Sequence, residues 1–381
     1  MAADPLRPLE GLLVVSLEQA VAAPYCTSRL ADAGARVIKI ERDGGDFARG
    51  YDAFVGGESS YFVWLNRGKE SVVLDIKAAD DLALLRTLIA QADVLVQNLA
   101  PGAMARAGLD PERLQADHPR LIICSIAGYG AGGPYAERKA YDLLIQAESG
   151  MASITGSPEA PGRIGVSACD IACGMNAHAA ILQALLARQV TGRGQSIEVS
   201  LFDAMADWMA VPLLHHAHDG VGPRRVGLAH PSIAPYGVYA CGDGSAVLLS
   251  IQNQREWVSL CAEVLNDVAL ATRPEFATNV SRVKHRQALD EAITERLQRY
   301  DGAGLVAALD GAGVAYGRLN DVGGLARHPH LRLGTLKTPA GEARIPVPAA
   351  RFDGASPRLG DSPALGAHTE RVKAEFGSRA E

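Results

Sequence analysis

The first 130 residues alternate short β-rich runs with helical stretches, and no other feature of the chain constrains its fold as strongly. The segments that predict a strand, or a helix followed by a strand, are 11–20, 28–42, 71–77, 80–98 and 110–130. Strands that alternate with helices of about 10–15 residues are typical of βαβ units. The sequence therefore predicts an α/β protein with a mainly parallel sheet that helices cover on both faces.

The chain changes character after its midpoint. Residues 171–190 predict a long helix rich in small residues, which is followed by the turn TGRGQ and a strand over residues 196–205 (SIEVSLFDAM). After residues 215–227 (HHAHDGVGPRRVG), a hairpin around residues 242–244 and helices to about residue 312 indicate a second, smaller domain. The length of 381 residues exceeds what one hydrophobic core usually serves, which also favours two domains.

Composition excludes several classes of protein. Hydrophobic residues make up 48% of the chain and charged residues 21%, as in folded proteins and unlike disordered ones. The formal net charge of −6 provides no basic surface for nucleic acid. The N-terminal segment has no basic stretch followed by a long apolar run, and no later stretch has about 18 uninterrupted apolar residues. We therefore expect a cytoplasmic protein with no nucleic-acid or membrane partner.

Two cysteines flank the aspartate of VSACDIACGM, residues 166–175. Cys169 and Cys173 would share one face of a helix, but a zinc site needs four ligands and no second Cys/His pair stands at metal spacing. We therefore predict no metal and two buried, reduced thiols. Asp170 has two interpretations at this point: an N-cap of the helix that follows, or a partly desolvated carboxylate that acts as a nucleophile.

Other motifs do not indicate a bound cofactor or another nucleophile. His215, His216 and His218 precede a Gly-Pro-Arg segment without a carboxylate cluster, so a polar linker is favoured. The turn LEQAVAAPYCTSRL lacks the G-x-G-x-x-G of dinucleotide sites, and GYGAGGPY lacks the Lys-Ser/Thr of a P-loop. No G-x-S-x-G elbow is present. Nicotinamide binding and Ser-His-Asp catalysis are therefore disfavoured.

Six segments occur along the chain in this order: AAPYCTSRLADAGARVIKIER, LNRGKESVVLDIK, ADVLVQNLAPGAMARAGL, GYGAGGPY, TGRGQSIEVSLFDAM and LGAHTERV. Together they resemble the family III CoA-transferases, which include formyl-CoA:oxalate and carnitine CoA-transferases and the α-methylacyl-CoA racemases. The resemblance spans about residues 8–375. It implies a Rossmann-like large domain over 1–215, a smaller α+β domain with its linkers over 216–325, and a return to the large domain over 326–381. It also implies a homodimer whose two chains interlock.

The resemblance implies a role for Asp170. In the transferases of this family, the nucleophile is an aspartate immediately before the long helix that precedes TGRGQ, which is Asp170 in this sequence. The implied mechanism forms a mixed anhydride on Asp170, then an aspartyl-CoA thioester that the acceptor carboxylate attacks. CoA and acyl-CoA are substrates, and no prosthetic group is expected. Water must be kept from both covalent intermediates.

The resemblance also implies binding residues. The positions that match CoA contacts are Arg42, Leu74, Lys77, Asn98, Leu99, Arg106 and Lys139, and the cations among them suit the phosphates of CoA. The acyl pocket is expected to include Val21, Arg67, Tyr141 and His230, with His230 in a covering segment, 227–237, that reaches Asp170 of the second chain. Leu99 replaces a common phenylalanine and Ala20-Val21 replaces the Val-Gln of the oxalate enzyme, which disfavours oxalate.

We expect the acids to be C4 to C6 dicarboxylates, with succinyl-CoA paired with a mesaconate-, itaconate- or citramalate-like acid. Arg67, Arg225 and His230 are candidates to bind the second carboxylate. Two alternatives stay open. A racemase of this fold needs a His-Asp step where the chain has Tyr141-Asp142, and tyrosine is a poor base near neutral pH. A CoA-binding protein without turnover is the other alternative.

Overall fold

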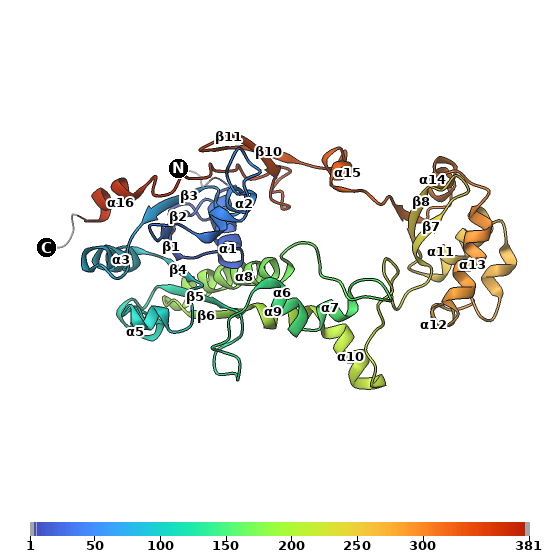
Figure 1. Cartoon of the computed structure of the whole chain (residues 1–381), viewed down its shortest axis with the longest axis horizontal. Helices are drawn as coiled ribbons and strands as arrows, with labels where there is room; N and C mark the ends of the chain where they lie inside the picture. The colour runs from blue at the N-terminus through green and yellow to red at the C-terminus, as the bar shows by residue number, and fades with distance from the viewer. Residues whose placement is uncertain (1–3, 5, 378–381) are drawn as a thin grey trace. The chain divides into compact units, whose positions relative to one another are not determined.

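The computed structural model describes residue 4 and residues 6–377 of the chain. These residues form two compact units (Figure 1). Unit 1 runs to Met151, resumes over Arg163–Val211 and ends with the residues from Arg332 onward. Unit 2 comprises Ala152–Gly162 and Pro212–Leu331. The sequence offers no reason to separate residues 152–162 from their neighbours.

Unit 1 is built on a six-stranded parallel sheet with the strand order β3-β2-β1-β4-β5-β6. The strands are β1 (Leu13–Leu17), β2 (Arg36–Glu41), β3 (Lys69–Val73), β4 (Val94–Gln97), β5 (Ile122–Ala127) and β6 (Ser196–Ser200). The predicted parallel α/β sheet is confirmed. The strand order reverses between β1 and β4, and in open α/β sheets ligands bind outside the carboxyl ends of the strands at such a point.

Helices cover both faces of this sheet. They are α1 (Ala22–Asp32), α2 (Ser60–Asn66), α3 (Ala79–Gln91), α4 (Ala103–Arg106), α5 (Pro111–Asp117), α6 (Asp142–Glu148), α8 (Ala168–Thr191), α9 (Leu201–Trp208) and α16 (Thr369–Phe376), with a 3-10 turn, η1, at Phe47–Gly50. On one face, buried leucines of α3 and α5 pack with Val372 and Phe376 of α16 against the strands. On the other face, α1 and α8 pack together along the sheet (Figure 1).

The C-terminal part of the chain belongs to unit 1. A hairpin, β10 (Leu333–Thr338) and β11 (Gly341–Pro346), precedes α16. His368 accepts a hydrogen bond at Nδ1 from the backbone N–H of Ser71 at 3.1 Å, so the residue before α16 is fixed to β3. Arg36 of β2 pairs with both Glu70 and Glu375. The edge of the sheet at β3 is therefore tied to the last helix.

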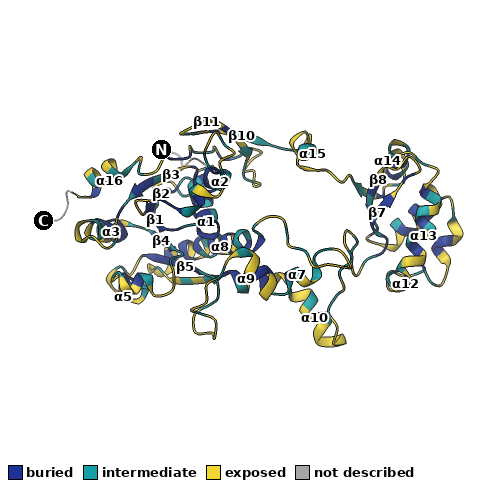
Figure 2. Cartoon of the chain, in the orientation of Figure 1, coloured by how far each residue is buried: buried dark blue, intermediate teal, exposed yellow. Residues whose placement is uncertain are grey.

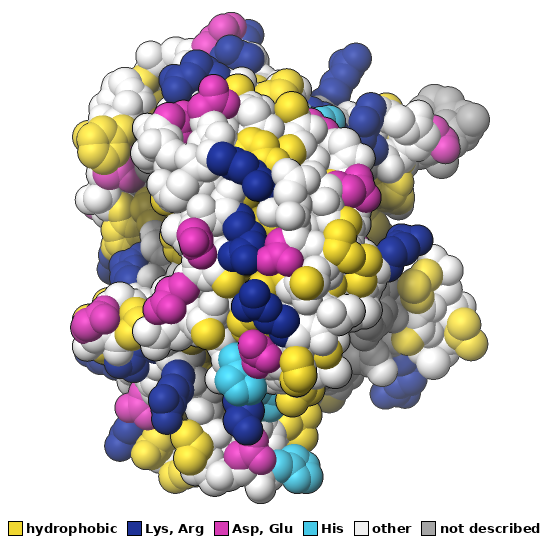
Figure 3. Space-filling model, turned by 90° about the vertical axis from the view of Figure 1, so that its right-hand side faces the viewer, with side chains coloured by type: hydrophobic (Ala, Val, Ile, Leu, Met, Phe, Trp, Pro, Cys, Tyr) yellow, Lys and Arg dark blue, Asp and Glu magenta, His cyan; other side chains and the backbone are white. Residues whose placement is uncertain are grey.

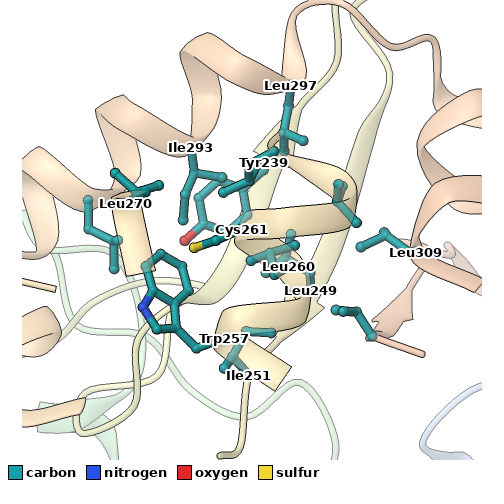
Figure 4. Close-up of a cluster of buried hydrophobic side chains, with 14 of the residues drawn as sticks. Tyr239, Leu249, Ile251, Trp257, Leu260, Cys261, Leu270, Ile293, Leu297 and Leu309 are labelled. Carbon is teal, nitrogen blue, oxygen red and sulfur yellow. The ribbon is translucent and has the colours of Figure 1, made fainter. Parts of the chain in front are cut away.

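Unit 2 contains a three-stranded antiparallel sheet, β7-β8-β9, with helices packed against it. The elements are β7 (Tyr236–Ala240), β8 (Ala246–Ser250), β9 (Ala315–Gly317), α11 (Gln254–Ser259), η2 (Leu260–Val264), η3 (Val268–Thr272), α12 (Asn279–Lys284), α13 (Arg286–Leu297), α14 (Gly302–Gly311) and α15 (Val322–Ala326). Trp257, Leu260 and Ile293 are fully buried in its core (Figure 4). Two short helices, α7 (Met151–Ile154) and α10 (Ala210–Asp219), cross the boundary between the units.

The structure corrects three sequence predictions about secondary structure. His215, His216 and His218 belong to α10 rather than to a polar linker, and His216 and His218 lie in its last turn. The strand predicted from Ser196 ends at Ser200, because the hydroxyl of Ser200 caps α9 by accepting from the N–H of Asp203. The long helix begins at Ala168, three residues before its predicted start.

Exposure differs sharply between α8 and α10. Helix α8 is long and apolar enough to cross a membrane by length and composition, but it packs against α1 and strands β5 and β6, as a core helix does. Helix α10 has no buried residue (Figure 2). The face in Figure 3 shows basic and acidic side chains interspersed, without a large patch of one sign.

Candidate active site

Asp170 lies in the first turn of α8, where the carboxylate of another residue caps the helix. Ser167 occupies the N-cap position but makes no side-chain capping bond. Instead, Oδ1 of Asp142 accepts hydrogen bonds from the N–H groups of Cys169 at 2.8 Å and of Asp170 at 3.4 Å. Oδ2 of Asp142 accepts from Nε2 of Gln146 at 2.8 Å. The N-cap interpretation of Asp170 is therefore wrong, since Asp142 performs that function.

The carboxylate of Asp170 is left without a compensating partner. Among residues 4 and 6–377, no donor or cation forms a hydrogen bond or ion pair with its oxygens. Burial, and then the charge of Asp142, raise the pKa of Asp170 to about 7. A carboxylate that remains reactive and only partly ionised near neutral pH is a feature of catalytic sites.

The two cysteines beside Asp170 are packing residues. Cys169 and Cys173 are both fully buried, and no disulfide links the described cysteines. Burial, followed by the charges of Asp142 and Asp170, raises the pKa of Cys169 to about 12, so its thiol stays protonated. In the described part of the chain, no three His, Cys, Asp or Glu side chains are grouped so that they could hold a metal ion.

A close crossing of two helices brings Asp170 to the turn that follows β1. A Cβ atom added to Gly174 of α8 would lie 2.5 Å from the carbonyl oxygen of Ala22, the first residue of α1. Only a glycine allows this approach. Asp170 lies one helical turn before Gly174, so it neighbours the turn formed by residues 18–21. Both helices begin at the carboxyl edge of the parallel sheet, which is the edge where ligands bind in such folds.

The predicted CoA-contacting residues follow the carboxyl ends of β2, β3, β4 and β5, and the topology therefore places them at one edge. Arg42, Lys77, Arg106 and Lys139 are exposed there. Leu74 and Leu99 pack into or against the core of unit 1, with Leu74 only 2% exposed. The four cations could reach anionic groups of a ligand, whereas Leu74 offers its side chain to the protein interior.

Asn98 has a structural use that the sequence did not indicate. Its Oδ1 accepts from the backbone N–H of Gln19 at 2.9 Å and its Nδ2 donates to the carbonyl of Gln19 at 2.8 Å. Asn98 follows β4 and Gln19 follows β1, so this pair of bonds joins the two strands at the reversal of strand order. The side-chain amide of Asn98 is therefore occupied by the protein, which argues against the predicted contact with CoA through that group.

The predicted acyl-pocket residues are divided between the two units of the chain. Val21 and Tyr141 belong to unit 1, near Asp170: Val21 is buried at the start of α1, and Tyr141 is 60% exposed immediately before Asp142. Arg67 is 1% exposed, and its guanidinium binds the carboxylate of Asp32 through Nε and Nη2. The predicted role of Arg67 toward a substrate carboxylate is not supported, because Asp32 already neutralises it.

His230 and Arg225 belong to unit 2. All three nitrogen groups of the Arg225 guanidinium donate to backbone carbonyls, those of Ser153, Ser157 and Pro158, so Arg225 is not available for a substrate carboxylate. His230 stacks on Tyr236 at 5.4 Å between ring centroids. Burial, and then the charge of Arg286, lower the pKa of His230.

The roles of two residues of the site were not found from the sequence. Asp142 has no local signal, because the N–H groups that it binds come 27 and 28 residues later. Tyr51 follows η1, and burial, then the charges of Asp46 and Asp170, raise its pKa to about 12. Its ring packs edge-on against Tyr61 at 5.4 Å between centroids. Tyr51 therefore lies within electrostatic range of Asp170, and its ring contacts the ring of Tyr61.

Comparison with known proteins now adds to this geometry. The profile of CoA-transferase family III matches residues 9–369. The chain belongs to this family. It is 36% identical to the acetyl-CoA:oxalate CoA-transferase of Acetobacter aceti over 99% of this chain and 97% of that protein. It is 34% identical to the succinate–glutarate CoA-transferase of Agrobacterium fabrum, with 97% and 96% of the two chains covered. The predicted family and the predicted class of enzyme, an acyl-CoA:carboxylate CoA-transferase, are confirmed.

Solved structures support the same relationship. A CAIB/BAIF family protein from Brucella suis is 36% identical, with a TM-score of 0.81 and coverage of 97% of this chain and 99% of that one. A hypothetical protein from Mycobacterium tuberculosis is 27% identical, with a TM-score of 0.84 and coverage of 97% and 100%. The match extends over both units in each case.

Proposed function

We propose that this enzyme moves CoA from an acyl-CoA, with succinyl-CoA as the donor, to a free dicarboxylic acid through covalent intermediates on Asp170. The observation that carries the proposal is the unpaired carboxylate of Asp170, one turn from the α1–α8 crossing and at the edge where the predicted CoA contacts gather. A partly desolvated carboxylate is a better nucleophile than a hydrated one, because it has lost the water that would stabilise its charge.

The steps exchange acyl groups without a net redox change. Asp170 attacks the thioester carbonyl of the donor, the C–S bond breaks, and a mixed anhydride and a CoA thiolate form. The thiolate attacks the aspartyl carbonyl, which releases the donor acid and leaves an aspartyl-CoA thioester. The acceptor carboxylate attacks this thioester, the thiolate leaves, and its attack on the acceptor carbonyl regenerates Asp170. Each covalent intermediate conserves the free energy of the original thioester.

The acceptor is proposed to be a dicarboxylate because the relatives act on such acids. Relatives of 30–34% identity are named as transferases for glutarate, D-citramalate and mesaconate. The relative of 36% identity is named for oxalate, so Leu99 and Ala20-Val21 do not suffice to exclude that acid. The sequence identity of the chain to enzymes with different acceptors is similar, so a direct assay must identify the acceptor of this enzyme.

Residues 227–237 are proposed to cover the acyl group, with His230 facing the acceptor and the segment reaching Asp170 of a second copy. Side chains of α12 and α13 fix the middle of this segment. Asn279 binds the backbone of Ser232 and Ala234, and Arg286 donates to the carbonyls of His230 and Ile233. A segment held in this way can present the imidazole of His230 in one orientation. His230→Ala should raise the KM for the acceptor, and unchanged acceptor kinetics would contradict the role.

A homodimer is proposed because apolar side chains of unit 1 are exposed in the single chain. On the last turns of α8, Leu186 is 64% and Val190 is 90% exposed, and Trp208 of α9 is 48% exposed. Leu186 and Val190 are one helical turn apart and so share one face of α8, and contiguous exposed apolar side chains mark interaction surfaces. Light scattering should give twice the mass of the chain, and Val190→Glu should lower that mass toward one chain.

The decisive experiment compares the wild type with Asp170→Ala. Each is incubated with succinyl-CoA and glutarate, mesaconate, citramalate, itaconate or oxalate, and the CoA esters are identified by mass. We expect new esters only with the wild type, and hydroxylamine should trap an acyl group on Asp170. Retained transfer by Asp170→Ala would overturn the mechanism. Exchange of the α-hydrogen for deuterium without an acceptor acid would instead indicate a racemase.

A further inference from the structure

A group of four fully buried charged side chains lies below the turn that follows β1. Nζ of Lys39 is 2.8 Å from Oδ2 of Asp46 and 3.7 Å from Oε1 of Glu18, and Nζ of Lys69 is 2.6 Å from the same oxygen of Glu18. All four side chains have no exposed surface. We call Glu18, Lys39, Asp46 and Lys69 the buried charge cluster. Two cations and two anions balance one another within it.

The buried charge cluster holds the backbone of residues 18–24 at three points. Oδ1 of Asp46 accepts from the N–H of Ala20 at 3.0 Å. Nζ of Lys39 donates to the carbonyl of Glu18 at 3.4 Å, and Nζ of Lys69 donates to the carbonyl of Pro24 at 3.0 Å. The cluster therefore fixes both the end of β1 and the first turn of α1, which are the two sides of the β1–α1 turn.

Ala20 has a backbone conformation that an alanine rarely adopts. Its φ is 63°, in the left-handed region, where the Cβ atom crowds the backbone. Such a residue persists only where its surroundings determine its conformation, and strained residues of this kind concentrate at functional sites. The surroundings here are Asp46, which binds its N–H, and Asn98, which binds both backbone groups of Gln19.

A stabilising role alone does not account for the cluster. Removing four charges from water is costly, and apolar side chains of similar volume often stabilise a protein as well as a buried ion pair does. What apolar side chains could not do is bind the N–H of Ala20 and the carbonyls of Glu18 and Pro24. The cluster is thus suited to determine where the backbone of the turn lies.

The turn is the neighbour of the nucleophile. Ala22 contacts Gly174 of α8, and Asp170 lies one helical turn before Gly174. Val21, between the strained Ala20 and this contact, is 3% exposed. A shift of the turn would therefore move the wall beside Asp170 without touching Asp170 itself.

We propose that Asp46 is a positioning residue for CoA transfer: together with Lys39 it holds Ala20 in its left-handed conformation and so places the β1–α1 turn against the reacting carboxylate of Asp170. This inference rests on the proposed role of Asp170 as nucleophile. Asp46 touches neither Asp170 nor the proposed CoA contacts through any hydrogen bond or ion pair in the described part of the chain. Its effect on the reaction is exerted through the backbone of the turn.

A matched control exists at the other end of β1. Oδ2 of Asp93 accepts from the N–H of Leu13 at 3.0 Å, and its Oδ1 pairs with Arg188 at 2.9 Å. Asp93 thus resembles Asp46, since each binds a backbone N–H beside β1 and one cation, although Asp46 also accepts from the N–H of Ala48 and so caps η1. Asp93, however, lies at the amino edge of the sheet, away from Asp170. Loss of either aspartate should destabilise the fold, but only loss of Asp46 should disturb the reaction.

The test measures kcat and the KM for succinyl-CoA, per folded molecule, for Asp46→Ala, Asp46→Asn, Asp93→Ala and Asp170→Ala. We expect kcat to fall about 10- to 100-fold in Asp46→Ala, as misplacement near a reacting group does, while the KM for succinyl-CoA stays within about twofold. Asp93→Ala should keep its kcat. Asp46→Asn, which keeps an acceptor for the N–H of Ala20, should lose less than Asp46→Ala and serves if the latter does not fold.

Each outcome decides one question. Unchanged kcat in the Asp46 variants, with transfer abolished in Asp170→Ala, would overturn the positioning role and leave the nucleophile in place. An equal loss of kcat in Asp93→Ala and Asp46→Ala would also overturn it, because the effect would then follow from destabilisation alone. Retained transfer by Asp170→Ala would instead overturn the proposed function, whatever the Asp46 variants do.

Discussion

Each end of helix α8 carries a buried or partly buried charged side chain, which is compensated at one end and uncompensated at the other. At its C-terminal end, Arg188 is almost fully buried and binds the carboxylate of Asp93 together with two backbone carbonyls, so its charge is fully compensated. At its N-terminal end, Asp170 is partly buried with no cation or donor on its oxygens among the described residues, and a second carboxylate, Asp142, lies beside it. One end is arranged for stability, and the other retains an uncompensated charge.

This difference follows the two edges of the parallel sheet. Helix α8 runs from the carboxyl edge, where the strands point and where ligands bind in open α/β sheets, to the amino edge. An uncompensated carboxylate costs free energy in the folded protein. That cost is expected where the residue must react, and the comparison can be tested with paired substitutions, one at each edge.

The largest effect is expected from Asp142→Ala. This change removes the acceptor for the N–H groups of Cys169 and Asp170, so the first turn of α8 should fray and misplace the nucleophile. We expect turnover per folded molecule to fall about 100-fold and stability to fall by about 1 kcal/mol, as for other lost helix caps. Asp110→Ala, which removes the carboxylate cap of α5, is the control. Equal losses of turnover in the two variants would contradict the assignment.

A smaller effect is expected where the helices cross. A Cβ atom at Gly174 would lie 2.5 Å from the carbonyl oxygen of Ala22, and one at Gly194, near the amino edge, would lie 2.0 Å from the carbonyl oxygen of Leu121. Each alanine substitution should cost about 1–3 kcal/mol through overpacking. Only Gly174→Ala should also lower turnover per folded molecule, by about 10-fold, because it separates α1 from α8 beside Asp170. Denaturant unfolding and initial rates would check this, and loss of turnover in Gly194→Ala would count against it.

The part of the fold that could be predicted is the part encoded locally. The alternation of strands and helices predicted the parallel sheet correctly, because the apolar runs and glycine stops that define each element are contiguous in the sequence. The start of α8 could not be placed, since its capping group comes from Asp142 and not from the segment 166–170. The histidines of α10 were assigned to a linker although Val211, Leu213 and Leu214 precede them, and these apolar residues are exposed in the structure.

The candidate site divides in the same way. Asp170 was found because the family resemblance assigns the nucleophile to the position at the start of the long helix before TGRGQ, which is a feature of order along the chain. The sequence did not show that Asp32 binds Arg67 or that Gln19 binds Asn98, because the two residues of each pair are far apart in the sequence. A polar residue has a limited number of hydrogen bonds, and only the fold decides whether the protein or a ligand receives them.

The pH dependence of the first chemical step should report the pKa of Asp170. Because Asp170 must be ionised to attack, the rate of acyl-enzyme formation should rise with pH through about 7, the pKa to which burial and Asp142 raise this carboxyl. Asp142→Asn keeps an acceptor for the N–H groups but removes the charge. The rising limb of the pH–rate profile should therefore move to lower pH by up to about one unit. Asp93→Asn should leave the limb in place. A limb that does not move in Asp142→Asn would show that burial alone sets the pKa.

The smallest effect is a gain in stability on removal of the nucleophile. The folded-state pKa of Asp170, about 7, lies above the ordinary value of 3.8, so the folded protein holds the proton more tightly than the unfolded chain. The contribution of Asp170 to stability is therefore fully present below about pH 4 and is lost as the pH rises through 7.

At pH 8 we expect Asp170→Asn to stabilise the fold by about 1 kcal/mol, as at other sites where activity and stability conflict. The gain should vanish near pH 4, whereas Asp93→Asn should destabilise the fold at pH 8 because Arg188 loses its partner. Thermal unfolding of both variants at the two pH values would measure this, and a loss of stability in Asp170→Asn at pH 8 would mean that the carboxylate has a partner in solution.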